Sequence, residues 1–197
     1  MALTDRDRCL LRLSAAICLG RWDVVAALRR SAPAPPDRSW REAVLQAHLF
    51  AGFPRVVEAW RVLGAAGGLG TPSAAETEGA ETEDLAAGDS LFAAIYAENA
   101  PAVGQELALY HPALARWIRG HAYGRVLTRG GLSPAERELL GVACLAALDQ
   151  ERQLAAHARG AIRCGADPED LAGALLAVGD LLAPKRLAAL LAIVARR

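Results

Sequence analysis

The stretch LSPAERELLGVACLAALDQERQLAAHARGAIRCGADPEDL, residues 132–171, has the clearest helix boundaries in the chain. Ser133 is a good N-cap, Pro134 suits the first helical position, and Glu136 completes the S-x-x-E pattern of a capping box. The leucines and alanines that follow fit one broad apolar face. This stretch therefore predicts a helix that begins near residue 134.

The same stretch contains two further boundaries. Asp149 offers a break before a second apolar run, which ends at Cys164 with Gly165 placed for the left-handed position after a helix. Residues 167–170, DPED, repeat the capping pattern and predict the start of a third helix. The first two helices should form an antiparallel hairpin.

Such a hairpin could bring a carboxylate and an imidazole face to face. Glu138 lies about ten residues before the turn and His157 eight or nine after it, so a rise of about 1.5 Å per residue puts both at a similar height. A carboxylate that orients an imidazole is a common way to build a general base or proton relay. The alternative is structural, because a Glu in the first turns favours the helix dipole and a His among alanines is often a packing residue.

These residues also carry a family resemblance. The segments RELLGVACLAAL and QLAAHARGAIRCGADPEDL, with HPALARWIRGHAYGRVLTRGGLS before them, resemble the carboxymuconolactone decarboxylase family, which includes the alkylhydroperoxidase D-like proteins. The similarity runs from about Gly88 to Pro184. It implies an all-helical unit without a metal or an organic cofactor.

Two positions distinguish this chain from the peroxidase branch of the family. The peroxidase branch has a Cys-x-x-Cys pair where this chain has Gln150 and Gln153, although Glu138 and His157 stand at the family's spacing. A dithiol mechanism has no nucleophile without those cysteines. The resemblance leaves the thiol-free, decarboxylase-like branch, a lyase in which His157 takes part in proton transfer on a small organic acid or lactone. Gln150 and Gln153 are then candidates for substrate binding, because their amides can hydrogen-bond a carboxylate or carbonyl.

Two residues of the preceding helix are weaker candidates for the same site. His121 and Tyr123 lie in ALARWIRGHAYGRVL, residues 113–127, where Leu114 and Trp117 suggest a packing face. They could border a substrate pocket or be ordinary residues at the edge of the core.

Composition favours an all-α protein. Of the 197 residues, 53% are hydrophobic and only 5% aromatic, alanine and leucine dominate, and no alternating β-branched run appears. The formal net charge is zero with the basic residues spread out, which argues against a nucleic-acid partner. No apolar run reaches a membrane-spanning length, so we expect a cytoplasmic protein without a membrane partner. The four cysteines have no zinc-site spacing.

The chain also suggests an internal repeat, in which the stretch that begins at Leu132 resembles the stretch 129 positions upstream that begins at Leu3. Thr4-x-x-Asp7 is a capping signal like Ser133-x-x-Glu136, and the helices that follow have similar compositions. We expect two copies of an alkylhydroperoxidase D-like helical unit packed together. The first copy lacks the candidate pair, because Cys9 stands where Glu138 does and Leu28 where His157 does.

Three segments follow from this hypothesis. Residues 1–70 form a degenerate N-terminal copy, residues 71–89 an acidic flexible linker, and residues 90–197 the C-terminal copy with its lead-in helices. REAVLQAHLFAGFP, residues 41–54, resembles the family's E-V-L-L-Q-x-x-x-Y-x-G-x-P motif with Phe50 in place of tyrosine.

Two functions stay open. The first is cofactor-free proton transfer or decarboxylation on a small organic acid or lactone by Glu138 and His157. The second is a catalytically degenerate helical assembly protein, since the pair is lost from one copy and both thiols from the other. A third, antioxidant peroxidase function is disfavoured by the missing Cys-x-x-Cys. The resemblance also implies homo-oligomers, and three duplicated chains would form a trimer of double units.

Overall fold

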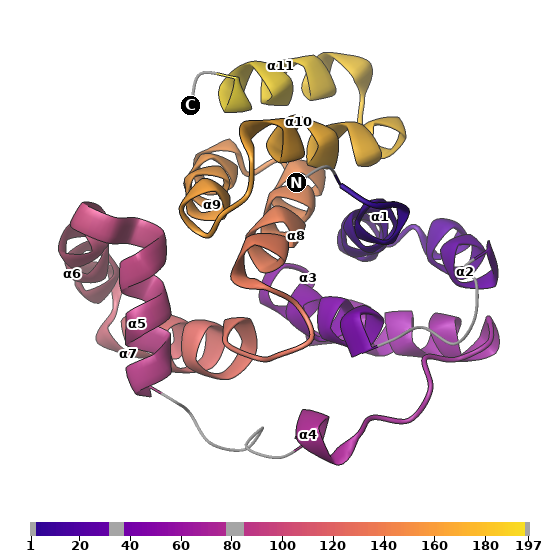
Figure 1. Cartoon of the computed structure of the whole chain (residues 1–197), viewed down its shortest axis with the longest axis horizontal. Helices are drawn as coiled ribbons and strands as arrows, with labels where there is room; N and C mark the ends of the chain where they lie inside the picture. Colours follow the sequence, from indigo (N-terminus) through magenta and orange to yellow (C-terminus); the bar gives the residue numbers. More distant parts are fainter. Residues whose placement is uncertain (1–2, 32–37, 78–84, 196–197) are drawn as a thin grey trace. The chain divides into compact units, whose positions relative to one another are not determined.

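The computed structural model describes residues 3–31, 38–77 and 85–195. Every regular element in these residues is a helix, and no β-strand occurs among them, so the all-α fold class is confirmed (Figure 1).

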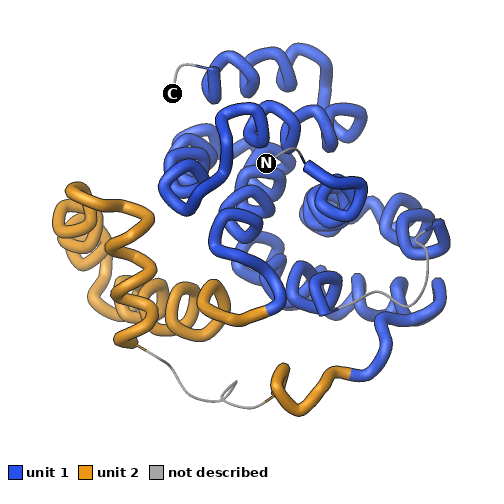
Figure 2. The backbone as a smooth tube through the Cα atoms, in the orientation of Figure 1, with its two compact units in different colours: residues 1–71, 131–197 blue, residues 72–130 orange. Residues whose placement is uncertain are grey.

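The chain divides into two compact units, coloured in Figure 2. Unit 1 joins residues 1–71 to residues 131–197, and unit 2 comprises residues 72–130. This division differs from the segments expected from the sequence, because the helices before residue 131 separate from the C-terminal segment. Whether the chain arose by duplication stays a prediction.

Unit 1 contains the predicted hairpin and the helices around it. Its elements are α1 (Asp5–Leu19), α2 (Trp22–Ser31), α3 (Arg38–Ala65), α8 (Pro134–Ala147), α9 (Glu151–Arg163), α10 (Pro168–Ala177), the 3-10 turn η3 (Gly179–Leu181) and α11 (Pro184–Val194). Helix α8 packs against α1, α3, α9 and α10 (Figure 1). The core of unit 1 is therefore built around α8.

The boundaries of α8 follow the local sequence. The Ser133 hydroxyl accepts from the backbone N–H of Glu136, and the Glu136 carboxylate accepts from that of Ser133. Thr4 and Asp7 form the same reciprocal box at the start of α1. Each such cap stabilises a helix by about 1 kcal/mol. Both predicted capping boxes are confirmed.

The other predicted boundaries of the hairpin are also found. Asp149 has φ 63° in the turn before α9, and Gly165, with φ 100°, follows the end of that helix. Asp167 and Asp170 form a third capping box at the start of α10.

Helix α3 changes direction inside the family-like segment. Gly52 has φ 76° and ψ 164°, so the helix is interrupted there and resumes through Pro54. Only glycine adopts such a conformation readily, and a proline at the start of the second half needs no backbone donor.

A fully buried polar cluster joins α3 to α8. The Arg137 guanidinium donates to the Glu42 carboxylate at 3.0 Å and to the Gln46 amide oxygen at 3.0 Å, and Gln46 Nε2 donates to the Arg137 carbonyl at 2.7 Å. The side chains of Arg137 and Glu42 are at most 1% exposed. Buried charges are tolerated only when paired and hydrogen-bonded, and this cluster meets that requirement between α3 and α8.

Unit 2 is also helical. Its elements are α4 (Ala74–Thr77), α5 (Leu85–Tyr96), the 3-10 turn η1 (Ala97–Asn99), α6 (Ala100–Tyr110), α7 (Pro112–Trp117) and the π-helix η2 (Ile118–Leu127). Gly88 on α5 lies so close to η2 that an added Cβ would be 2.5 Å from the Arg119 carbonyl oxygen. Backbone contact through this glycine explains how α5 and η2 pack together.

Two expectations for this region differ from the structure. The expected linker, residues 71–89, includes α4 and the start of α5, while residues 78–84 lie outside the described part. Leu114 and Trp117, expected to pack, are 38% and 64% exposed. Helical spacing identified an apolar face, but it could not tell whether another element covers it.

None of the helices in the described ranges is long and apolar enough to cross a membrane.

Candidate active site: a buried carboxylate and imidazole

Glu138 and His157 meet between α8 and α9. His157 Nδ1 lies 3.0 Å from Glu138 Oε2. Glu138 is on the second turn of α8, and His157 lies the matching distance after the turn at Asp149. The proximity predicted from helix rise is confirmed, whereas the catalytic role of the two residues stays a prediction.

The two partners differ in exposure. The Glu138 side chain is 1% exposed, but that of His157 is 18% exposed. Since an ionised carboxylate only accepts hydrogen bonds, Nδ1 carries the donated proton. Within the described residues, no second hydrogen bond to the His157 ring occurs. Nε2 is therefore the nitrogen that can exchange a proton with a bound molecule.

Two further residues position the imidazole, and sequence reasoning missed both roles. The Phe50 ring, on α3, meets the His157 ring edge-on with centroids 5.7 Å apart. Gly141, one turn after Glu138 on α8, leaves room for the imidazole, since an added Cβ would lie 2.9 Å from Nδ1. The spacing of Glu138 and Gly141 on one helical face was visible in the sequence. The contact with Phe50 was not, because it joins distant segments.

Glu138 changes the acidity of His157. Burial lowers the pKa of the imidazole, but the attraction of the Glu138 carboxylate and the hydrogen bond to it outweigh burial, so the pKa is raised above 6.5. A raised pKa keeps the imidazolium populated close to neutral pH. The site can then present a proton at Nε2 and take one back.

Replacing Glu138 with glutamine should lower the pKa of His157 below that of the wild type. The amide keeps the ring buried but removes the charge that stabilises the imidazolium. An NMR titration of the His157 ring protons measures this shift directly. Equal pKa values in the two proteins would show that Glu138 does not control the imidazole.

The same shift predicts a pH dependence of stability. Because the folded-state pKa is raised, the contribution of His157 to the free energy of unfolding is fully present below about pH 6.5, the unfolded value. This contribution disappears as the pH rises through the folded-state pKa. In Glu138→Gln the free energy of unfolding should not fall over this pH range.

Replacing Gly141 with alanine should displace the imidazole. The new methyl group would contact Nδ1, Cγ and Cε1 of His157 at 2.9–3.4 Å, so the ring must move away from Glu138 and its pKa should fall. Alanine also gains up to about 1 kcal/mol of helix propensity, which makes the titration a better measurement than stability. The matched control is Gly104→Ala on α6, where an added Cβ meets nothing within 4 Å. An unchanged His157 pKa in Gly141→Ala would contradict this assignment.

Of the four expected substrate-binding residues, two belong to each unit. Gln150 and Gln153 are exposed, and the Gln150 amide donates to the Leu148 carbonyl at 3.3 Å. His121 and Tyr123 belong to unit 2, where the Tyr123 ring packs edge-on against Phe92 and its hydroxyl lies 3.3 Å from that of Tyr96. For Tyr123 these contacts favour the packing alternative. The binding roles of all four stay predictions.

Cys144 of α8 and Cys164, which follows the end of α9, are poor nucleophiles. Burial and the charge of Glu138 raise the pKa of the Cys164 thiol to about 11. The pKa of Cys144 is raised well above its usual value by a hydrogen bond that its thiol donates to Cys18 and by burial. Thiols in this state carry little thiolate at neutral pH.

No group of three or more His, Cys, Asp or Glu side chains that could hold a metal ion occurs within the described ranges.

The fold and the site define an all-α protein in which a helical hairpin holds a carboxylate against an imidazole. Residues 112–195 match the carboxymuconolactone decarboxylase family. The match contains both Glu138 and His157. It begins and ends later in the chain than the resemblance from Gly88 to Pro184 described above. No curated protein matches the chain.

Proposed function

We propose that the protein acts on a small organic acid or lactone by cofactor-free proton transfer, with Glu138 and His157 as the reacting pair. The observation that supports this most is the 3.0 Å contact between Nδ1 and the carboxylate inside the segment that matches the family. Partial exposure of His157 gives a bound molecule access to the ring.

Decarboxylation is the reaction that suits this pair. When a substrate carboxylate leaves as carbon dioxide, the electron pair of the broken C–C bond stays on the substrate. Protonated His157 then gives the Nε2 proton to that carbon, and Glu138 remains ionised and stabilises the imidazolium. The ring returns to its starting state when it takes a proton from water.

A peroxidase function has less support. Gln150 and Gln153 cannot supply a thiolate, and the raised pKa values of Cys144 and Cys164 make these thiols unreactive. Thiol-dependent reduction of an alkyl hydroperoxide is therefore not expected of this protein.

The second candidate is a non-catalytic assembly protein in which the pair only joins α8 to α9. The exposure of Gln150 and Gln153 favours it, because side chains that bind a substrate in an enclosed pocket are usually buried. In that case the pair contributes as a buried ion pair and nothing binds at Nε2.

A thermal-shift screen of small carboxylic acids and lactones separates the two candidates. We expect at least one compound to raise the melting temperature of the wild type but not of His157→Ala. The matched control is His48→Ala, which removes another half-buried imidazole of unit 1. Compounds that stabilise all three proteins equally, or none of them, favour the assembly protein.

We also propose that the chain forms homo-oligomers, a trimer of double units being the arrangement that the family resemblance implies. Large apolar side chains are exposed in each unit, with Phe53 66% and Val57 67% exposed on α3, and Leu109 86% and Trp117 64% exposed in unit 2. Such side chains are often covered by other subunits. Light scattering at micromolar concentration should give a multiple of the chain mass, and a monomeric mass would contradict this.

A further inference from the structure

Gln46, on α3, binds the backbone of the helix that carries Glu138. Its Nε2 donates to the Arg137 carbonyl oxygen at 2.7 Å, and its Oε1 accepts from the Arg137 guanidinium at 3.0 Å. The Gln46 side chain is buried, with 1% of the residue exposed. The Arg137 carbonyl and the Glu138 nitrogen belong to one planar peptide group. The Gln46 amide therefore holds the backbone from which the Glu138 side chain extends.

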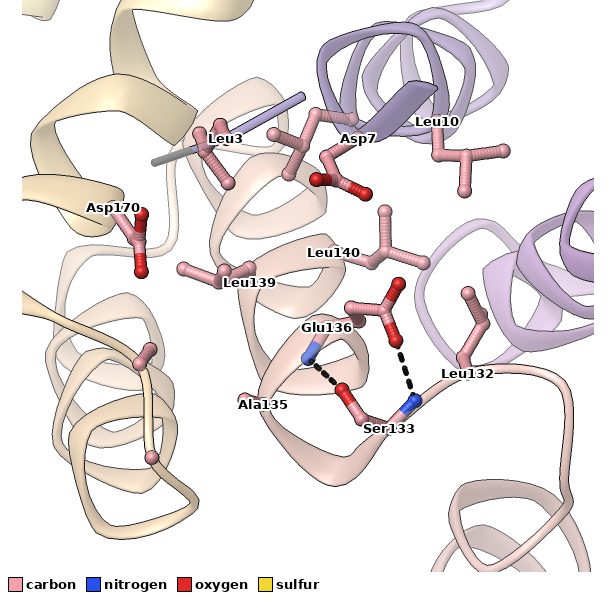
Figure 3. Close-up of a pocket in the computed structure, with 13 residues that line it drawn as sticks. Leu3, Asp7, Leu10, Leu132, Ser133, Ala135, Glu136, Leu139, Leu140 and Asp170 are labelled. Atoms are coloured by element: carbon pink, nitrogen blue, oxygen red, sulfur yellow. Dashed lines mark hydrogen bonds between the residues drawn. The ribbon is translucent and has the colours of Figure 1, made fainter. Parts of the chain in front are cut away.

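The capping box of α8 acts on an earlier turn of the helix. Its two hydrogen bonds, between Ser133 and Glu136, are drawn in Figure 3 beside an apolar pocket between α1 and α8. Glu138 lies on the following turn. Gln46 contacts α8 at this second turn, where the carboxylate leaves the helix.

The same face of α3 also reaches the imidazole. Phe50 stands four residues after Gln46, and residues four apart lie on one face of a helix. The backbone of α3 is helical up to the break at Gly52. The Phe50 ring meets the His157 ring edge-on, with centroids 5.7 Å apart. One face of α3 therefore contacts the peptide group before Glu138 and, one turn later, the partner of that carboxylate.

The two hydrogen bonds of Gln46 limit the movement of α3 against α8. Both ends of the amide bind one residue, Arg137, so a displacement of either helix here would lengthen at least one bond. Buried polar groups that lose their partners are costly. The contact between Glu138 Oε2 and His157 Nδ1 at 3.0 Å needs such precision, because hydrogen bonds weaken steeply when their geometry changes.

We infer that Gln46 is a positioning residue for the Glu138–His157 pair, which it holds through the Arg137 carbonyl on one side and through Phe50 on the other. Its part in catalysis rests on the proposed function, but its effect on the imidazole does not. The Glu138 carboxylate raises the pKa of His157. That pKa therefore reports how well the carboxylate is placed, whether or not a substrate is known.

The test is Gln46→Met, which keeps a side chain of similar length and removes both hydrogen bonds. NMR should show a lower pKa of the His157 ring than in the wild type. The Nδ1 proton, followed at low temperature, should move upfield, because its hydrogen bond to Glu138 becomes longer. The matched control is Val44→Ala, at another fully buried position of α3.

The control separates positioning from general stability. Val44→Ala should lower the free energy of unfolding, measured in urea, and leave both signals of His157 unchanged. If Gln46 only stabilised the fold, Gln46→Met would behave in the same way. The inference is overturned if folded Gln46→Met keeps the wild-type pKa and Nδ1 shift, or if Val44→Ala changes them as much.

Two further measurements complete the test. With an acid that the wild type turns over, Gln46→Met should lower kcat by at least about tenfold with little change in KM. If no acid is turned over, the proposed function fails and the NMR result still decides the positioning role. If Gln46→Met does not fold, the wild type decides, since the Gln46 side-chain amide signal should titrate with the midpoint of the His157 ring. An amide signal that does not follow the ring overturns the inference.

Discussion

Replacing Arg137 with alanine is expected to lower the free energy of unfolding by about 3–5 kcal/mol. The substitution leaves Glu42, which is 0% exposed, without the guanidinium at 3.0 Å, and it removes a donor from Gln46. Arg38 stays 3.4 Å from the Glu42 carboxylate, but the buried charge loses the closer guanidinium and its hydrogen bond, so much of the cost of desolvation is no longer offset. Urea unfolding followed by circular dichroism measures the change.

Two further variants show whether the cost comes from the buried charge. The double variant Arg137→Met, Glu42→Leu should recover much of the lost stability, because it removes both charges and keeps apolar volume. Arg61→Ala removes an arginine that is 69% exposed and paired with Glu58, so its cost should stay below about 1 kcal/mol. A loss below 1 kcal/mol for Arg137→Ala would show that the cluster does not hold α3 to α8.

Local sequence predicted the helix boundaries of unit 1 well. The boxes at Ser133, Thr4 and Asp167 depend on side chains that contact the backbone three residues away, so a single sequence is enough to identify them. The distance between Glu138 and His157 was predictable for a similar reason. A hairpin with a known turn and a fixed rise per residue determines which residues lie at the same height.

Local sequence patterns could not predict contacts between distant segments. The edge contact between Phe50 and His157 and the pairing of Arg137 with Glu42 join residues that are far apart in the sequence. The α1–α8 pocket was not predicted either, because it depends on how two helix starts meet. Trp117 shows the opposite error, in which an apolar pattern was interpreted as packing but the side chain is 64% exposed.

Replacing His157 with alanine should reduce turnover of the substrate by about 10²–10⁴-fold, the usual contribution of a positioned proton donor. Glu138→Gln should have a smaller effect, because it leaves the ring in place and changes its pKa. The activity lost in Glu138→Gln should be greatest in the pH range between the two His157 pKa values. In that range the imidazole is protonated in the wild type and neutral in the variant. His48→Ala should retain wild-type turnover.

The central claim is that Nε2 of His157 delivers the proton that replaces the lost carboxyl group. The most direct measurement is turnover in D₂O of an acid identified by the ligand screen, followed by NMR of the product and detection of the released carbon dioxide. The account predicts one deuteron on the carbon that lost the carboxyl group, at a rate that falls at least about 100-fold in His157→Ala. Turnover at the wild-type rate in folded His157→Ala, or no decarboxylation of any acid that binds, would contradict it.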